Sequence, residues 1–171
     1  PPTYGMYSVL ANINAVENRE VLLSTDFQPQ VEKILDAVDD NTKIIFLCSP
    51  NNPTGNSFSD ESVVKLLQNF KGLVVIDEAY IDFSDKESWL TEIDEYPNLV
   101  ITQTLSKAYG LAGIRLGICF GSEAVISVLN KIKPPYNVNE LTQQRAILRL
   151  NDSDKIKKEI ASIIEQREEL L

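Results

Sequence analysis

Three apolar runs in this chain are each followed directly by a polar cluster, and this feature constrains the fold most strongly. The runs are residues 43–48 (KIIFLC), 73–76 (LVVI) and 99–104 (LVITQT). Apolar residues at successive positions are typical of strands buried on both faces. Helical patterns separate the runs, and 171 residues suffice for one sizeable domain. The sequence therefore predicts an α/β fold, a three-layer sandwich around a mostly parallel sheet.

Helices are predicted between and after these strands. Ser59 precedes Asp60 and Glu61, an N-cap followed by acidic residues in the first turn. A further strand is predicted at residues 116–120, and the two prolines at 134–135 mark a change to helix alone. The predicted helices cover residues 29–38, 60–70, 87–95, 123–131, 139–150 and 152–171.

The polar clusters lie where the three apolar runs end. They are residues 49–55 (SPNNPTG), 77–80 (DEAY) and 104–107 (TLSK). In open parallel sheets, ligands bind in the crevice beyond the carboxyl ends of the strands. The three clusters are therefore expected to converge on one site.

The residue types in these clusters favour chemistry on an aldehyde cofactor. Lys107 closes a predicted strand, and a partly deprotonated lysine amine forms an imine with an aldehyde. Asp77 ends another strand and has the charge to pair with a protonated ring nitrogen. Donors for a ring oxygen and a phosphate stand nearby in the sequence: Tyr80, Asn52, Arg115, Thr104 and Ser106.

Each of these features alone has a plainer interpretation. Taken singly, Asp77 would be an ordinary strand-end acid and residues 51–53 would be a turn. Lys107 would be a solvated amine and Arg115 an ion-pair partner. Their conjunction, in this order and each after an apolar run, favours a shared site.

Composition excludes several other classes of function. The net charge of −9 argues against a nucleic-acid partner and an anionic membrane surface, and no apolar stretch approaches membrane-spanning length. With no histidine, a Ser-His-Asp or Cys-His mechanism within this chain is ruled out. Cys48 and Cys119 lie in apolar runs without metal-ligand spacing, which predicts buried, reduced thiols in a cytoplasmic protein and no metal site.

Beyond these separate features, whole segments of the chain resemble a known enzyme family. Residues 51–55, 77–80 and 106–117 resemble the signature segments of fold-type-I, aspartate-aminotransferase-like enzymes, which use pyridoxal 5'-phosphate. The segments PPTYGMY, YIDF and PYNVN resemble the histidinol-phosphate branch of that family. The resemblance implies that residues 1–150 are part of the large, cofactor-binding domain. It also implies that residues 151–171 are a helix leading to a small C-terminal domain outside this segment.

The resemblance also implies roles for individual residues. Lys107 would be the Schiff-base lysine and general base, Asp77 the partner of the pyridinium nitrogen, and Tyr80 a donor to the phenolic oxygen; these three would be the catalytic residues. Glycines at 110, 113 and 117 would let the backbone pass close to the site or to a neighbouring strand, or would have a plain loop or packing role. The remaining cofactor contacts would come from Asn52 on the phenolic oxygen, Tyr4 on the ring face, and Thr104, Ser106 and Arg115 on the phosphate.

The implied reaction is transamination between histidinol phosphate and imidazole-acetol phosphate, with glutamate and 2-oxoglutarate, in histidine biosynthesis. The implied enzyme is a cytoplasmic homodimer, and this segment alone would be incomplete as a catalyst. Gln103 departs from the branch, where arginine is expected. The alternatives are an aromatic-amino-acid aminotransferase, a threonine-phosphate decarboxylase, or a non-catalytic domain of the same fold.

Overall fold

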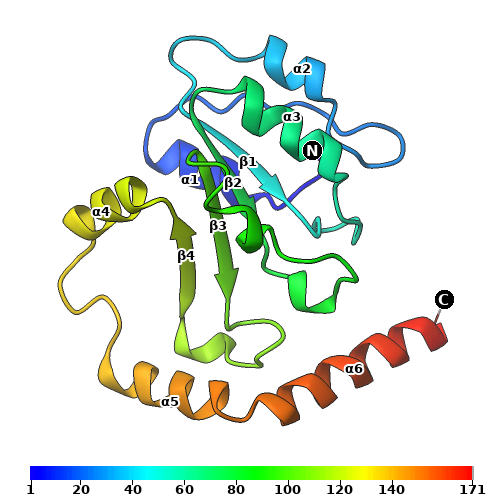
Figure 1. Cartoon of the computed structure of the whole chain (residues 1–171), viewed down its shortest axis with the longest axis vertical. Coiled ribbons are helices and arrows are strands. Elements are labelled where there is room, and N and C mark those ends of the chain that lie inside the picture. The colour runs from blue at the N-terminus through cyan, green and yellow to red at the C-terminus, as the bar shows by residue number, and fades with distance from the viewer. Residues whose placement is uncertain (171) are drawn as a thin grey trace.

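A four-stranded sheet forms the centre of the molecule in the computed structural model, which describes residues 1–170 (Figure 1). The strands are β1 (Ile44–Cys48), β2 (Leu73–Asp77), β3 (Leu99–Thr104) and β4 (Gly117–Gly121), in the order β1-β2-β3-β4. The first three run parallel and β4 is antiparallel to β3. The predicted α/β class with a mostly parallel sheet is confirmed.

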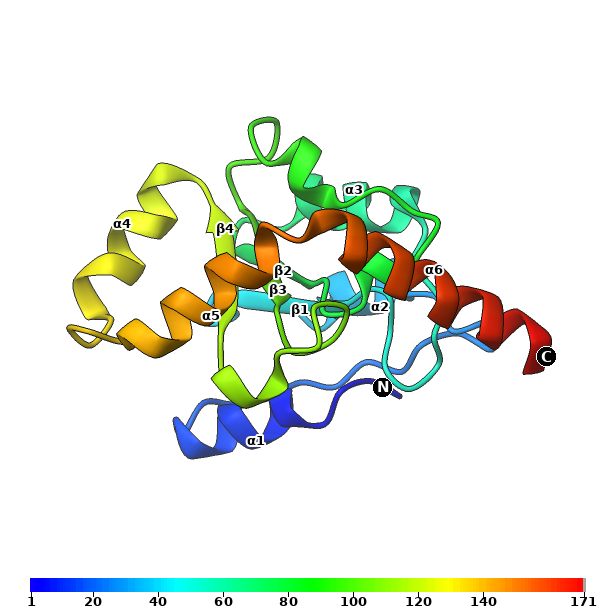
Figure 2. The same ribbon diagram turned by 90° about the horizontal axis from the view of Figure 1, so that it is seen from below.

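Helices lie on both faces of this sheet and make the three layers. Helix α1 (Met6–Ile13) and helix α3 (Asp60–Asn69) are on opposite sides of the strands in the view from below (Figure 2). Helix α2 (Val31–Asp36) packs against α3. The predicted cap of α3 is present, because the Ser59 hydroxyl accepts a hydrogen bond from the Ser62 amide.

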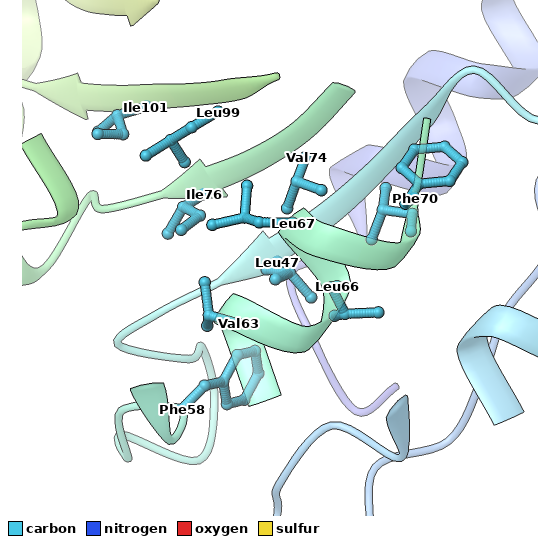
Figure 3. Packing of buried hydrophobic residues seen from close by; sticks show 11 residues of the cluster. Leu47, Phe58, Val63, Leu66, Leu67, Phe70, Val74, Ile76, Leu99 and Ile101 are labelled. Carbon is cyan, nitrogen blue, oxygen red and sulfur yellow. The ribbon is translucent and has the colours of Figure 1, made fainter. Parts of the chain in front are cut away.

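The main core lies between α3 and the sheet (Figure 3). Val63, Leu66 and Leu67 of α3 pack on side chains of the strands, where Val74, Ile76 and others are fully enclosed. Burying large aliphatic side chains contributes about 1.5–3 kcal/mol each relative to their exposure, so this interface is a main source of stability. It also holds β1, β2 and β3 in register, and therefore holds their carboxyl ends together.

Three local expectations differ from the structure. Strand β1 is buried on one face only: Ile44 is 45% and Phe46 is 49% exposed, because α1 leaves much of the other face uncovered. Cys48 is buried as predicted, but Cys119 on the edge strand β4 is exposed. The helix predicted at 87–95 is a short 3₁₀ turn, Trp89–Glu92, between two other irregular segments.

The C-terminal part is helical, as the pattern predicts. Helix α4 (Glu123–Ile132) follows β4, and α5 (Glu140–Leu150) and α6 (Ser153–Leu170) run past the end of the sheet at which β3 terminates (Figure 1). Among the helices of residues 1–170, none is long and apolar enough to cross a membrane. The division of the chain into a large-domain part and a connecting helix stays a prediction.

Candidate active site

The polar clusters after β1, β2 and β3 meet at one end of the sheet. Cys48 pairs with Asp77 and Asp77 with Thr102 in the strand register, so the three strands end at nearly the same level. Beyond the last pairs, the Ser49 amide donates to the Asp77 carbonyl (3.0 Å) and the Glu78 amide to the Thr102 carbonyl (2.8 Å). The predicted convergence is therefore present.

The carboxylate of Asp77 is held through both of its oxygens. Oδ1 accepts a hydrogen bond from the backbone amide of Ala79 (3.1 Å), and Oδ2 accepts one from the phenol of Tyr7 (2.7 Å). Tyr7 belongs to α1, a helix that the apolar pattern does not predict. The sequence-based set of site residues does not include Tyr7, and nothing in its spacing from Asp77, 70 positions away, points to the contact.

Tyr7 is held between two other aromatic rings. Its ring stacks on Phe46 of β1, with centroids 5.1 Å apart, and makes an edge contact with Tyr4 at 5.7 Å. Burial, and then the hydrogen bond to Asp77, raises the pKa of the Tyr7 phenol well above its usual range. Burial likewise raises the pKa of the neighbouring Cys48 thiol. Both groups are therefore neutral at physiological pH.

Lys107 lies beside Tyr80, although it does not close a strand. Strand β3 ends at Thr104, and Lys107 occupies the turn that follows. Its Nζ lies 5.1 Å from the centre of the Tyr80 ring, a cation–π distance. The Lys107 side chain is exposed in residues 1–170.

The predicted phosphate ligands are not gathered into one contact network in residues 1–170. The Thr104 hydroxyl is committed to the turn, accepting from the Ser106 amide (3.1 Å) and donating to the Leu116 carbonyl (3.4 Å). The guanidinium of Arg115 is exposed and donates to the Ala112 carbonyl (2.8 Å). Among the described residues, no hydrogen bond joins Arg115 to Ser106.

The cluster after β1 uses its two asparagines differently. Asn51 is buried, donates to the Pro2 carbonyl (3.0 Å) and to the Thr54 hydroxyl (2.7 Å), and accepts from Thr3. It ties the N-terminal segment to the end of β1. Asn52 is half-buried, and its side-chain amide makes no hydrogen bond within residues 1–170, which leaves it available to a ligand.

A second carboxylate, Glu78, lies inside the protein behind this end of the sheet. It is 1% exposed and accepts hydrogen bonds from the Ser88 hydroxyl (2.6 Å), the Trp89 amide (2.7 Å) and the Gln103 side-chain amide (2.9 Å). Gln103, the position that departs from the resembled branch, is therefore a donor to a buried carboxylate.

Helix α5 supports the turn that carries Lys107. Arg149, whose side chain is 13% exposed, donates to the Tyr109 carbonyl (2.9 Å) and forms an ion pair with Glu159 of α6. Leu105 and Leu111, at the two ends of the turn, pack with Ala146 of α5 in a second apolar cluster.

The three glycines predicted to allow close backbone approach have different environments. Gly110 has a φ of +66°, in the left-handed region that favours glycine, and its amide closes the turn on the Lys107 carbonyl (2.9 Å). A Cβ at Gly117 would make an ordinary contact with the Gln103 carbonyl, and one at Gly113 would meet nothing. Within residues 1–170, no neighbouring strand approaches Gly113, and its approach to a bound group stays a prediction.

Comparisons with known proteins agree with this geometry. The family model described as aminotransferase class I and II matches residues 1–171. The histidinol-phosphate aminotransferase of Flavobacterium johnsoniae is 92% identical over 171 residues, which are 100% of this chain and 49% of that protein. The chain thus spans about half the length of the curated relatives it matches.

Solved structures give the same result at the level of the fold. The histidinol-phosphate aminotransferase of Clostridium acetobutylicum has a TM-score of 0.89 at 25% identity, over 98% of this chain and 52% of that one. The enzyme of that name from Sinorhizobium meliloti, solved in complex with pyridoxal-5'-phosphate, has a TM-score of 0.88 at 27% identity, over 98% of this chain and 47% of that one.

Proposed function

Because this chain belongs to the aminotransferase class I and II family, we propose that it forms the cofactor-binding part of a histidinol-phosphate aminotransferase dependent on pyridoxal 5'-phosphate. One arrangement in the structure carries the proposal. The carboxylate of Asp77 ends β2, and the amine of Lys107 follows β3 and lies 5.1 Å from the centre of the Tyr80 ring. Carboxylate, amine and phenol are the groups that this cofactor's reactive ring requires.

The donors of the site fit pyridoxal phosphate group by group. Asp77 accepts two hydrogen bonds, whereas a carboxylate has about four acceptor sites, so capacity remains for a ring N–H. The Asn52 amide is available for the phenolic oxygen, beside the Tyr80 phenol. Ser106 and Arg115 supply a hydroxyl and a guanidinium for the phosphate, with Thr104 shaping the turn that presents Ser106.

Pyridoxal phosphate, when bound, supplies an aldehyde for amine exchange and a protonated ring that withdraws electrons from the substrate Cα. Asp77 would pair with the ring nitrogen through a charge-assisted hydrogen bond. The Lys107 amine would hold the cofactor's aldehyde carbon and would serve as the base that moves the proton at the substrate Cα. Tyr80 and Asn52 would donate to the ring's oxygen, and Tyr4 would pack on the ring.

The full reaction that we propose converts histidinol phosphate to imidazole-acetol phosphate as 2-oxoglutarate takes up the amino group. The proposal includes a cytoplasmic homodimer, the most frequent symmetric assembly of soluble enzymes. The substrate assignment is supported by the names of the relatives and by their sequence identity to this chain, which is 92% for the Flavobacterium johnsoniae protein. Sedimentation of the full-length protein tests the dimer.

Covalent trapping of the cofactor tests the chemistry. The full-length protein is mixed with pyridoxal phosphate, reduced with borohydride and mapped by peptide mass analysis. We expect the label on Lys107, and we expect Lys107→Ala to lose both the label and at least about a hundredfold in turnover, since a positioned base contributes 10² or more. Lys157→Ala, which removes an exposed amine on α6, is the matched control. Label spread over surface lysines would refute the proposal.

Substrate profiling separates the alternatives, which share these cofactor residues. A histidinol-phosphate aminotransferase exchanges an amino group with glutamate and releases no carbon dioxide. A threonine-phosphate decarboxylase releases carbon dioxide, and an aromatic-amino-acid aminotransferase prefers a substrate that bears a carboxylate.

A further inference from the structure

Tyr7 is the single side chain that donates a hydrogen bond to Asp77 in residues 1–170. Its phenol contacts Oδ2 at 2.7 Å, whereas the other donor, to Oδ1, is the backbone amide of Ala79. Hydrogen bonds from neutral donors to a charged acceptor are short and strong, and this distance is typical of them. The backbone donor is part of the turn after β2, so the phenol is the one contact that a substitution removes without altering that turn.

The ring of Tyr7 is fixed by its neighbours, so its hydroxyl has one position. Phe46 stacks on one face at an interplanar angle of 20°, and Tyr4 meets the ring edge at 86°. A rigid donor restrains the carboxylate that it contacts, because rotation of the carboxylate would break a charge-assisted hydrogen bond. Asp77 is thus restrained on Oδ2 by an aromatic stack and on Oδ1 by the main chain.

Within the described residues, no cationic side chain helps Tyr7 to restrain the Asp77 carboxylate. Among residues 1–170, no lysine or arginine lies within ion-pair distance of Asp77. The titratable groups facing the carboxylate are the Tyr7 phenol from α1 and the Cys48 thiol from β1. Both carry raised pKa values, chiefly through burial, and so stay neutral. The phenol therefore keeps its proton and remains a donor.

We propose that Tyr7 is a positioning residue that acts through Asp77, holding the carboxylate aimed at the ring nitrogen of the bound cofactor. The inference rests on the proposed function and deepens it. A carboxylate restrained on both oxygens presents its remaining acceptor sites to the ring N–H in one geometry, so the charge-assisted hydrogen bond that holds the ring proton is always made. A ring that keeps this proton is a stronger electron acceptor, which is the property that transamination needs.

The test is Tyr7→Phe in the full-length holoenzyme. The substitution keeps both ring contacts and removes one hydroxyl. We expect turnover to fall about tenfold, as for loss of a hydrogen bond to a charged group, with little change in KM. Tyr96→Phe is the matched control, since Tyr96 is a half-buried phenol at the opposite end of β3, where its carbonyl accepts from the Leu99 amide.

A spectroscopic readout separates positioning from packing. Without the phenol, Asp77 is free to turn on one side and its hydrogen bond to the ring nitrogen weakens, so the ring holds its proton less firmly and carries less positive charge. The nitrogen that joins Lys107 to the cofactor then keeps its proton to higher pH. The pH midpoint at which the visible absorption band of the holoenzyme changes should therefore move upward. Incorporation of 3-fluorotyrosine at position 7, a stronger donor of nearly the same size, should move this midpoint downward.

A double-mutant cycle on cofactor affinity completes the test. If Tyr7 acts through Asp77, Tyr7→Phe weakens cofactor binding in the wild-type background and has little further effect in Asp77→Ala. Additive losses, or band midpoints that stay at the wild-type pH in both position-7 variants, would overturn the inference. Failure of the wild-type protein to bind the cofactor through Lys107 would instead overturn the proposed function.

Discussion

Two adjacent carboxylates at the end of β2 are held in opposite ways. Asp77 is half-buried and keeps acceptor capacity that faces the site, whereas Glu78 is enclosed and contacts protein donors only. Alternation along a strand sends neighbouring side chains to opposite faces, so the proposed cofactor partner and the enclosed carboxylate point away from each other. Glu78 accepts from three donors, and these hydrogen bonds offset the loss of hydration on burial, which is worth several kcal/mol of free energy for a carboxylate.

Gln103 is one of these donors, which leads to a prediction about stability. Gln103→Leu keeps the approximate size of the side chain and removes the N–H that contacts Glu78. We expect a loss of about 1–3 kcal/mol in the free energy of unfolding, because the carboxylate stays buried with one donor fewer. Chemical denaturation measures it, with the exposed Gln144→Leu on α5 as control. Equal stability of the two variants would contradict the prediction.

A surface carboxylate gives a prediction about pH. Hydrogen bonds from Arg19 lower the pKa of Asp39 to about 2, and the same guanidinium donates to the Ala37 carbonyl (2.9 Å). Because the folded-state pKa is depressed, the stabilisation is present above the unfolded pKa of about 4 and is lost as pH falls toward about 2.

Asp39→Asn should therefore lower the unfolding temperature slightly at neutral pH, and this difference from the wild type should shrink between about pH 4 and pH 2. Thermal unfolding at a series of pH values measures it. A difference that stays constant over that range would show that the ion pair is not its cause.

At the scale of elements, α5 clamps the turn that presents Lys107. Arg149 reaches from α5 to the Tyr109 carbonyl, Thr142 donates to the Ile114 carbonyl (3.2 Å), and Leu105 and Leu111 pack beneath. The turn has few backbone hydrogen bonds of its own, so its geometry depends on a helix more than thirty residues further along the chain.

Arg149→Met keeps the apolar stem and removes the donors of this clamp. We expect faster hydrogen exchange at the amides of Gly110 and Leu111, which close the turn, because local opening no longer breaks the contact to Tyr109. The control is Arg167→Met on α6, whose guanidinium is exposed and pairs with the adjacent Glu168. If hydrogen exchange at both amides is unchanged, Arg149 does not stabilise the turn.

The elements that the sequence predicts well are those whose signals are local. The strands, the cap at Ser59 and the polar clusters are each read within a few residues, and all are present. Helix α1 and the contact from Tyr7 to Asp77 depend on a fold that joins distant positions, so no periodicity reveals them. The open face of β1 escapes prediction as well, since apolar composition does not tell which neighbours cover a strand.

At the scale of the whole molecule, the site is open and apolar surface is uncovered. Lys107 and Arg115 face water, and water weakens the interactions that stabilise charge in a transition state. We therefore expect residues 1–171 alone to give no measurable transamination in a coupled glutamate assay, whereas the full-length protein is active. A rate from the segment itself would contradict this expectation.

Self-association of the segment is the second expectation at this scale. Val9, Leu10 and Ile13 make an exposed apolar face on α1, and Ile44 and Phe46 of β1 are exposed as well. Exposed apolar surface of this extent favours association. The sedimentation coefficient of residues 1–171 should rise with concentration, and Ile13→Lys should reduce the rise more than Gln166→Lys on α6. Equal effects of the two lysines would point to net charge as the cause.

The order of the strands has a consequence for how the protein is made. Position in the sheet follows position in the chain, from β1 to β4. Each of β2, β3 and β4 therefore finds a partner in the strand synthesised just before it. Asp77 and Lys107 are thus positioned to come together during synthesis, before the helices that later secure the Lys107 turn have been translated.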